Sequence, residues 1–219
     1  MELNPSELSI RQRYTLMITA ITPRPIAVVS TCSPAGAVNL APFSFFNGVG
    51  SNPMTLVFCP ANGRLGEEKD TLKNASPPEQ GGTGEFVVGL ATAEQIRKVV
   101  AASEPLPFGE SEFERVGLTP VPSRTVRPPR LLESPVSFEC RTLSVIRTHP
   151  GQPAGGNLVL GEVLHFFVRD DLIDDRFSID ADMLAIIGRM GGNDYVRCGS
   201  RFELPPGLAA LDATEPGPG

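Results

Sequence analysis

The sequence predicts a mainly β protein, an antiparallel barrel or sandwich with peripheral α-helices. About six segments rich in β-branched and aromatic residues are separated by turns that contain Gly and Pro. These segments follow one another as hairpins, without the alternating helices of a parallel sheet. With 219 residues and 41% hydrophobic content, the chain can bury one sizeable core. We expect a single domain over residues 1–202 and a mobile tail, rich in Pro and Gly, over residues 203–219.

The first half of the chain contains four predicted strands. Residues 25–32, PIAVVSTC, form a nearly continuous apolar run and predict a buried strand. The turn residues SPAG connect it to a second extended segment at 37–41. Residues 54–59 and 85–91 predict two further strands, joined by a long connection that contains Gly and Pro.

The second half contains a long hairpin. Residues 136–146 and 157–168 predict two strands across a Pro/Gly loop at 147–156. The preceding segment, 105–135, is rich in Pro and charged residues, so we expect it on the surface with one helical turn near 111–116.

Two helices are predicted from capping and stop signals. Residues 92–102 carry a capping-box spacing at Thr92 and Gln95, followed by an apolar stripe. A last helix should begin after Asp180 and end at Gly191, where a glycine stop is expected.

The charge pattern argues against several classes of partner. The formal net charge is −6 and the basic residues are scattered, so we expect neither nucleic acid nor an anionic membrane as a partner. No run approaches the roughly 18 apolar residues of a membrane span, and the N-terminal residues do not follow the order of a secretory signal. We therefore expect a cytoplasmic location.

Cysteine and histidine usage offers little for a metal site. The four cysteines lie far apart without a Cys-x-x-Cys pair, so we expect buried free thiols. His149 lies in a hairpin loop and His165 on an alternating strand face, and we expect a structural role for both. Neither has a second ligand at metal-binding spacing, so no metal is expected.

Common catalytic motifs are missing from the sequence. It contains no P-loop, no His-Glu-x-x-His and no Gly-x-Ser-x-Gly, and GVGSNP breaks the dinucleotide pattern at Pro53. With few acid–base residues, an enzyme of this sequence would rely on a cofactor for its chemistry.

One segment has the composition of an anion site. Arg64 and Lys69 precede Asp70 and Thr71, which stand where a helix would start. Helix N–H groups, the Thr71 hydroxyl and the two cations would favour a phosphate, provided that the two glutamates before Lys69 point away. Alternatively, Asp70 caps a surface helix and the cations are solvated.

A second unusual segment, 39–53, reads NLAPFSFFNGVGSNP. It places Phe43, Phe45 and Phe46 among Gly, Ser, Asn and Pro. Alternation would put Phe43 and Phe45 on one side and Ser44 and Phe46 on the other. The aromatic side chains could wall a cleft, and the small residues would let the backbone approach a flat ring closely.

These two segments belong to a series of matches between about residues 14 and 195. In order, the matching segments are TPRPIAVVST, NLAPFSFFNGVGSNP, KDT, GEFVV, LESPVSFECR, LVLGEV and GRMGGNDY. Together they resemble the flavin reductase-like, FMN-binding split-barrel family, specifically its flavoredoxin-like branch. The segment at 75–86 is longer and richer in Gly and Pro than we expect of that family.

The resemblance implies a six-stranded Greek-key split β-barrel that forms a homodimer, with FMN in each of two clefts between the subunits. It implies that the chain binds FMN with the following residues, in three groups: Ala41, Pro42, Phe43, Ser44, Phe45, Asn47 and Ser51 at the ring and ribityl; Arg64, Lys69, Asp70 and Thr71 around the phosphate; and Arg189 and Tyr195 beside the cleft. Near the C-terminus of the last predicted helix, Arg189 could instead complement the helix dipole.

The resemblance further implies that NADH or NADPH transfers hydride to flavin, which passes electrons to a flavin- or electron-accepting protein. No catalytic side chain is needed, because the flavin carries the hydride chemistry. Three alternatives stay open: an FMN electron carrier reduced by a protein partner, an oxidase related to the pyridoxal-phosphate oxidases, and a β-barrel without a cofactor.

Overall fold

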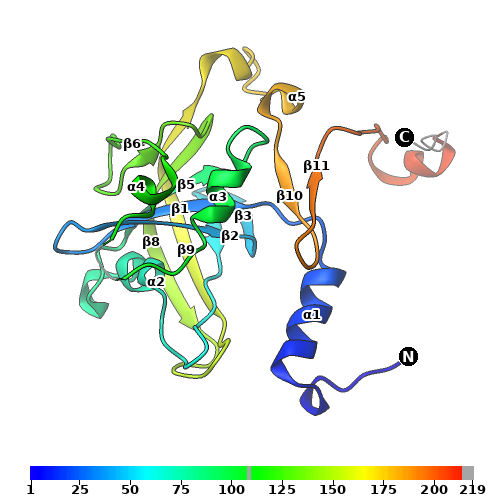
Figure 1. Cartoon of the computed structure of the whole chain (residues 1–219). Coiled ribbons are helices and arrows are strands. Elements are labelled where there is room, and N and C mark those ends of the chain that lie inside the picture. Colours follow the sequence, from blue (N-terminus) through cyan, green and yellow to red (C-terminus); the bar gives the residue numbers. More distant parts are fainter. Residues whose placement is uncertain (108–109, 214–219) are drawn as a thin grey trace.

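The main sheet of the protein has seven antiparallel strands (Figure 1). The computed structural model describes residues 1–107 and 110–213. The strands of this sheet are β1 (Ala27–Cys32), β2 (Val38–Phe43), β3 (Phe46–Ser51), β4 (Met54–Phe58), β5 (Glu85–Leu90), β8 (Val136–Arg147) and β9 (Asn157–Val168). Their spatial order is β2-β1-β5-β8-β9-β4-β3. The mainly β class is therefore confirmed, with one strand more in the sheet than the resemblance implied.

The additional strand is β3, which lies between the predicted strands at 37–41 and 54–59. It pairs with β4, with a register shift between Gly48 and Gly50. Residues 39–53 thus form two strands and a hairpin, and only Ser44 and Phe45 lie outside a strand between β2 and β3. We call these two residues the corner.

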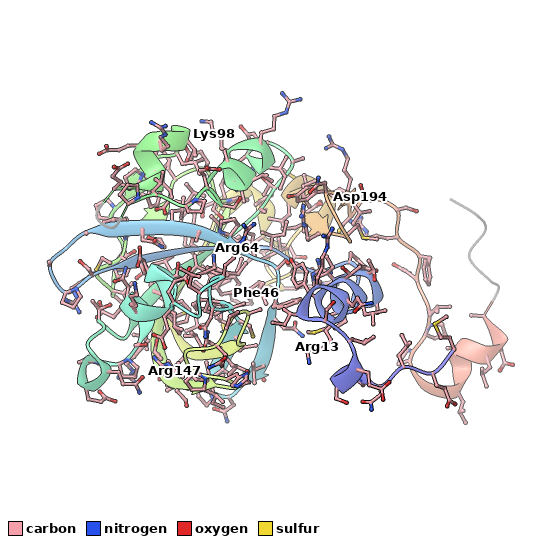
Figure 2. All side chains as sticks on the ribbon, turned by 60° about the horizontal axis from the view of Figure 1, so that its bottom comes forward. Arg13, Phe46, Arg64, Lys98, Arg147 and Asp194 are labelled. Carbon is pink, nitrogen blue, oxygen red and sulfur yellow. The ribbon has the colours of Figure 1, made fainter. Side chains whose placement is uncertain are left out.

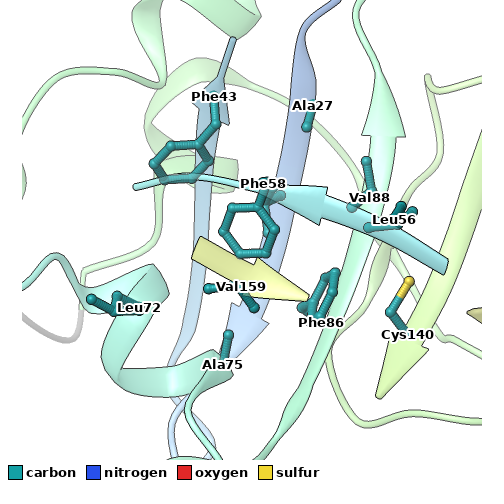
Figure 3. Close-up of a cluster of buried hydrophobic side chains, with 11 residues drawn as sticks. Ala27, Phe43, Leu56, Phe58, Leu72, Ala75, Phe86, Val88, Cys140 and Val159 are labelled. Carbon is teal, nitrogen blue, oxygen red and sulfur yellow. The ribbon is translucent and has the colours of Figure 1, made fainter. Parts of the chain in front are cut away.

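The corner has a topological consequence, because β2 and β3 lie at opposite edges of the sheet. Two residues can connect the edges only if the sheet curls until they meet at this point. The aromatic core shows the curl: the ring centroids of Phe43 on β2 and Phe58 on β4 are 5.4 Å apart. Phe58 in turn lies 5.1 Å from Phe86 on β5. Figure 3 shows these rings inside the curled sheet.

Helices cover the sheet on its two faces. Leu72 of α2 (Asp70–Ala75) is buried in the aromatic cluster with Phe43. A second cluster joins β1 and β2 to α3 (Ile96–Ala101) and α4 (Glu112–Val116), through residues such as Val99 and Phe113. The remaining short elements are β6 (Pro120–Val121), β7 (Arg130–Leu131) and the 3-10 helices Pro5–Glu7, Pro78–Gln80, Asp170–Leu172 and Gly207–Asp212.

The predicted start of α3 was wrong. The helix begins at Ile96, because Thr92 forms a β-bridge with Ile186 and Gln95 donates from Nε2 to the carbonyl of Leu90 at 2.8 Å. Neither residue is therefore free to form a capping box.

The predicted end of the last helix was wrong as well, whereas its start after Asp180 is confirmed, with Asp180 as the N-cap residue. α5 spans only Ala181–Leu184. Its C-cap residue is Ala185, whose φ of 49° lies in the left-handed region. Residues Ile187–Arg189 then form β10, which pairs with β11 (Tyr195–Arg197). The side chain of Ile187 is buried in the second core cluster.

An N-terminal helix, α1 (Ile10–Ala20), was not predicted. Ser9 and Gln12 form a capping box at its start, and Ile18 is its one buried residue. Figure 1 shows α1 projecting from the sheet beside β10 and β11, and in Figure 2 Arg13 lies on this helix, apart from the β-rich body.

The described residues contain no helix that is long and apolar enough to cross a membrane. Within the same residues, no group of three or more His, Cys, Asp or Glu side chains is arranged to hold a metal ion. All four cysteines are free thiols; Cys32 and Cys140 are buried, as expected, whereas Cys198 is exposed. Of the predicted tail at 203–219, residues 214–219 lie outside the described part of the chain.

Candidate functional site

The corner between β2 and β3 is held from two sides. Arg24 donates from Nε to the Ser44 hydroxyl at 3.2 Å. The backbone N–H of Cys59, which follows β4, donates to the carbonyl of Phe45 at 2.8 Å. The Arg24 guanidinium also lies 5.8 Å from the centroid of the Phe45 ring. Arg24 and the backbone of Cys59 therefore hold the backbone of the corner and both of its side chains in place.

The predicted alternation of the phenylalanines was wrong. Phe43 is buried in the aromatic cluster and Phe46 packs against the same cluster. Phe45 lies instead beside Arg24. The two-residue corner interrupts the strand period, so residues on either side of it return to the core face.

The side chain of Arg24 donates four hydrogen bonds, and only 4% of the residue's surface is exposed. Besides Ser44, it donates to the carbonyls of Ile18 and Ile21, each at 2.6 Å, and to that of Met190 at 2.9 Å. Burial lowers the pKa of the Arg24 guanidinium, which still leaves an arginine charged at neutral pH. Arg24 thus connects the end of α1 and the segment after β10 to the corner.

Arg189 and Tyr195 lie on the paired strands β10 and β11. The Arg189 guanidinium stacks over the Tyr195 ring at 4.4 Å and donates to the carbonyl of Gly192 at 2.6 Å. The backbones of Arg24 and Arg189 exchange two hydrogen bonds. These two predicted residues therefore lie beside the corner. The helix-dipole interpretation of Arg189 was wrong, because the residue is in a strand.

The predicted phosphate segment forms the start of α2. Lys69 occupies the N-cap position, and Asp70 pairs with Lys73 at 2.9 Å instead of capping the helix. Thr71 is 1% exposed, and its hydroxyl accepts a hydrogen bond from Asn39 Nδ2 at 2.9 Å. Asn39 is on β2, so this contact links the phosphate segment to the strand that leads into the corner.

The two glutamates before Lys69 have partners of their own. Glu68 pairs with Arg147 at 2.6 Å, and Glu67 accepts from the backbone N–H of Leu65 at 2.9 Å. Within residues 1–107 and 110–213, no carboxylate lies within ion-pair distance of Arg64 or Lys69, and both are exposed. The two cations can therefore interact with a bound anion.

The loop that carries Arg64 is attached to the β8–β9 hairpin. Asn157 donates from Nδ2 to Asn62 Oδ1 at 2.8 Å, and Asn62 donates from its own Nδ2 to the carbonyl of Gln152 at 3.0 Å. Gly66 lies so close to this hairpin that an added Cβ would be 2.2 Å from the carbonyl oxygen of Gly151. This network fixes the position of the loop backbone.

An apolar groove of about 300 Å³ lies along the β3–β4 hairpin, with Phe46, Gly48, Met54, Phe138 and Val163 among its lining residues. A volume of this size is at the lower end of small-molecule sites. The backbone at Gly48 is open, because a Cβ added there would have no other atom within 4 Å.

The other predicted ring contacts are spread along β2 and β3. Ala41 and Pro42 are half-buried on β2, whereas Asn47 is exposed and its Oδ1 accepts from the N–H of Gly48 at 3.0 Å. Ser51 pairs with Met54 at the hairpin tip, about 13 Å along the strand from Asn47. The structure thus brings most predicted residues to the corner and the start of α2, and places Ser51 away from them.

The side chains around the corner offer binding groups and no evident nucleophile. Burial raises the pKa of Cys59, so its thiol is protonated at neutral pH. Ser44 and Thr71 each accept a hydrogen bond and retain a hydroxyl hydrogen to donate. Together with two exposed cations and an apolar groove, they suit a ligand that combines a flat ring with a phosphate.

Sequence reasoning missed Arg24, Asn39 and Arg147. Arg24 is within the quoted segment TPRPIAVVST, but its partners at Ile18 and Met190 lie in other elements. No local pattern marks such a residue, because its hydrogen-bond partners are distant in the sequence.

Comparison with known proteins identifies a family. Residues 19–182 match the model of the Flavin reductase like domain family. Component B of nitrilotriacetate monooxygenase from Bacillus cereus is 33% identical, with a TM-score of 0.86 over 93% of this chain and 98% of its own.

Two further solved structures are similar. The 2-nitrobenzoate 2-nitroreductase NbaA of Pseudomonas fluorescens is 30% identical, with a TM-score of 0.82 over 95% of this chain and 97% of its own. The flavoredoxin of Desulfovibrio vulgaris (Miyazaki F) shares the fold, at 18% identity and a TM-score of 0.69 over 95% and 99% of the two chains.

Proposed function

The chain belongs to the flavin reductase like domain family, and on this premise we propose that it binds FMN and transfers hydride from NADH or NADPH to the flavin. The observation that carries the proposal is the continuity of the candidate site. The Asn39–Thr71 contact connects the start of α2 to β2, and β2 leads directly into the corner at Ser44 and Phe45. A phosphate group and a ring system could therefore be bound by adjacent parts of one surface.

The residues that would hold FMN fit its chemistry. The N–H groups at the start of α2, the Thr71 hydroxyl and the side chains of Arg64 and Lys69 would bind the phosphate. Glu68 is neutralised by Arg147, whereas the Glu67 carboxylate keeps its charge and accepts from the backbone N–H of Leu65. At the corner, the Ser44 hydroxyl would donate to the polar edge of the ring.

A bound flavin would supply the redox chemistry by accepting a hydride at its ring. The protein would supply orientation, because the corner is fixed by Arg24 and Cys59 and an apolar groove lies beside β3. Arg189 stacked on Tyr195 would form the opposite wall. No side chain is required to gain or lose a proton for the hydride step.

We also propose a homodimer. Several large apolar side chains are exposed in the single chain, among them Val49 and Met54 on the β3–β4 hairpin and Tyr14, Met17 and Ile21 on α1 and its end. Such faces in a monomer indicate an interaction surface. Sedimentation of the purified protein tests the proposal; a monomer that retains FMN on dilution would contradict a cleft shared between subunits.

The experiment for the main proposal is an anaerobic titration of the FMN-loaded protein with NADH and, separately, NADPH. We expect the long-wavelength absorption band of the flavin to bleach with at least one of them. If neither nicotinamide bleaches the flavin whereas dithionite does, the protein binds flavin but is not a nicotinamide-dependent reductase.

That second outcome would support the alternative, an FMN electron carrier reduced by a protein partner. A flavoredoxin shares the fold at 18% identity, which fits this alternative and the reductase equally. The similarity to a component of a monooxygenase instead favours a reductase whose flavin or electrons pass to a second protein. Fold alone does not decide between the two.

A further inference from the structure

The hydrogen bond between Arg24 and Ser44 determines what the Ser44 hydroxyl can do. A guanidinium has only donors, so the Ser44 oxygen must be the acceptor in this contact. The hydroxyl hydrogen is then directed elsewhere. The Ser44 hydroxyl hydrogen is therefore available to donate to a second group, which it would not be if the hydroxyl donated to its partner.

The direction of this contact is fixed because Arg24 cannot turn away. Its Nη1 donates to two carbonyls at the end of α1, those of Ile18 and Ile21, and its Nη2 donates to the carbonyl of Met190. With three carbonyls holding the two terminal nitrogens, Nε can point only toward the corner. The guanidinium is also buried, so water does not compete for its donors.

The charge of Arg24 strengthens the effect. Its four acceptors are three carbonyls and one hydroxyl, all neutral, and no carboxylate of the described residues lies within ion-pair distance. A hydroxyl that accepts from a cation is polarised and becomes a better donor. The oxidised flavin ring presents carbonyl oxygens and an unprotonated ring nitrogen, which are acceptors for such a donor.

We propose that Arg24 is a positioning residue that holds the Ser44 hydroxyl as a hydrogen-bond donor to the bound flavin ring. This inference rests on the proposed function, because it requires flavin at the corner. Arg24 does not touch the ligand; it acts through Ser44. Its contacts with the carbonyls of Ile18, Ile21 and Met190 hold the guanidinium in the position from which Nε reaches Ser44.

The test is a double-mutant cycle with Arg24→Gln and Ser44→Ala, measuring the Kd for FMN and the visible circular dichroism of the bound flavin. Each single variant should bind FMN about tenfold more weakly, equivalent to about 1.4 kcal/mol, and should shift the dichroism in the same sense. The double variant should bind no more weakly than Ser44→Ala alone, since Arg24 acts through that hydroxyl.

Two control variants separate positioning from general stability. Arg97→Gln removes an exposed arginine on α3, and Ser9→Ala removes the capping box of α1 without touching the corner. We expect Ser9→Ala to lower the melting temperature but to leave the dichroism of bound FMN unchanged. If it weakens FMN as much as Arg24→Gln does, Arg24 acts through α1 and the inference is overturned.

The outcomes distinguish the inference from the proposed function. Wild-type protein that binds no FMN would refute the proposed function itself. Wild-type protein that binds FMN, with Ser44→Ala unchanged in affinity and dichroism, would refute only the inference, and this result does not depend on whether Arg24→Gln folds. Independent, additive effects of the two substitutions would likewise refute it.

Discussion

Thr71 allows a test of the phosphate site in which almost nothing else changes. The side chain is 1% exposed, and Thr71→Val replaces its hydroxyl with a methyl group of similar size. Thr71→Ser is the matched control, since it keeps the hydroxyl and loses only the methyl. If the phosphate of FMN binds at the start of α2, only the first substitution removes a donor to it.

The structure sets the size of two effects. The Thr71 hydroxyl accepts from Asn39 at 2.9 Å, so Thr71→Val leaves that amide without its partner. Because Asn39 is only half-buried, we expect a stability loss near the lower end of the range for unsatisfied groups, about 1 kcal/mol. A hydrogen bond to a charged group is worth about 1.5–3 kcal/mol, which corresponds to roughly 10- to 150-fold weaker FMN binding.

Comparing the Kd of FMN with that of riboflavin isolates the contribution of the phosphate to binding. Riboflavin has the same ring and ribityl but no phosphate, so Thr71→Val should leave its Kd unchanged while the Kd for FMN rises. Fluorescence titration of both ligands against wild type, Thr71→Val and Thr71→Ser measures the difference directly. Equal weakening of FMN and riboflavin, or unchanged FMN affinity with a folded variant, would refute the placement of the phosphate.

Two further predictions concern stability. A Cβ at Gly161 would lie 2.3 Å from the Phe86 ring, so Gly161→Ala should destabilise the fold by about 1–3 kcal/mol, and an unchanged midpoint in urea would contradict the packing. Glu112 accepts from the N–H of Leu40 at 2.8 Å, and burial raises the pKa of its carboxyl. The folded protein then binds more protons than the unfolded chain, and stability falls as the pH rises from about 4.3 toward that raised pKa. Glu112→Gln keeps an acceptor but does not titrate, so its stability should fall less over this interval; identical pH profiles would show that the Glu112 pKa is not raised.

The long strands were predictable because their signals are local. Residues 25–32, 136–146 and 157–168 are apolar, β-branched or alternating, and β1, β8 and β9 formed close to those bounds. The predicted end of the helix after Asp180 was wrong because the residues up to Gly191 favour a helix by their local sequence. In the fold, Ile187 is buried and pairs with Arg197 on β11, which lies outside that segment. α1 was missed although its capping box was visible at Ser9 and apolar residues recur at helical spacing at Tyr14, Met17 and Ile21, where the fold leaves them exposed.

The residues of the candidate site also fall into a group that could be predicted from the sequence and a group that could not. The cations, the start of α2 and the corner residues Ser44 and Phe45 could be identified, because each group is close together in the sequence. The residues that hold this site in place could not be identified. Arg24 contacts Met190 and Arg147 pairs with Glu68, and in both cases the two residues are far apart in the sequence. Contacts of this kind are properties of the fold, so a single sequence without the fold gives no signal for them.

The strand order also sets a sequence of events during synthesis. β4 finds its second neighbour in β9, Phe58 opposite Val159, roughly a hundred residues later in the chain. Until β9 has left the ribosome, the β4 edge of the β3–β4 hairpin is unpaired in addition to the β3 edge, which stays at the edge of the sheet. β1 and β2 can pair early, but the corner joins them to a hairpin that must wait. The β4 edge therefore stays unpaired while about half of the chain is translated, and folding at low temperature or with chaperone assistance should raise the yield.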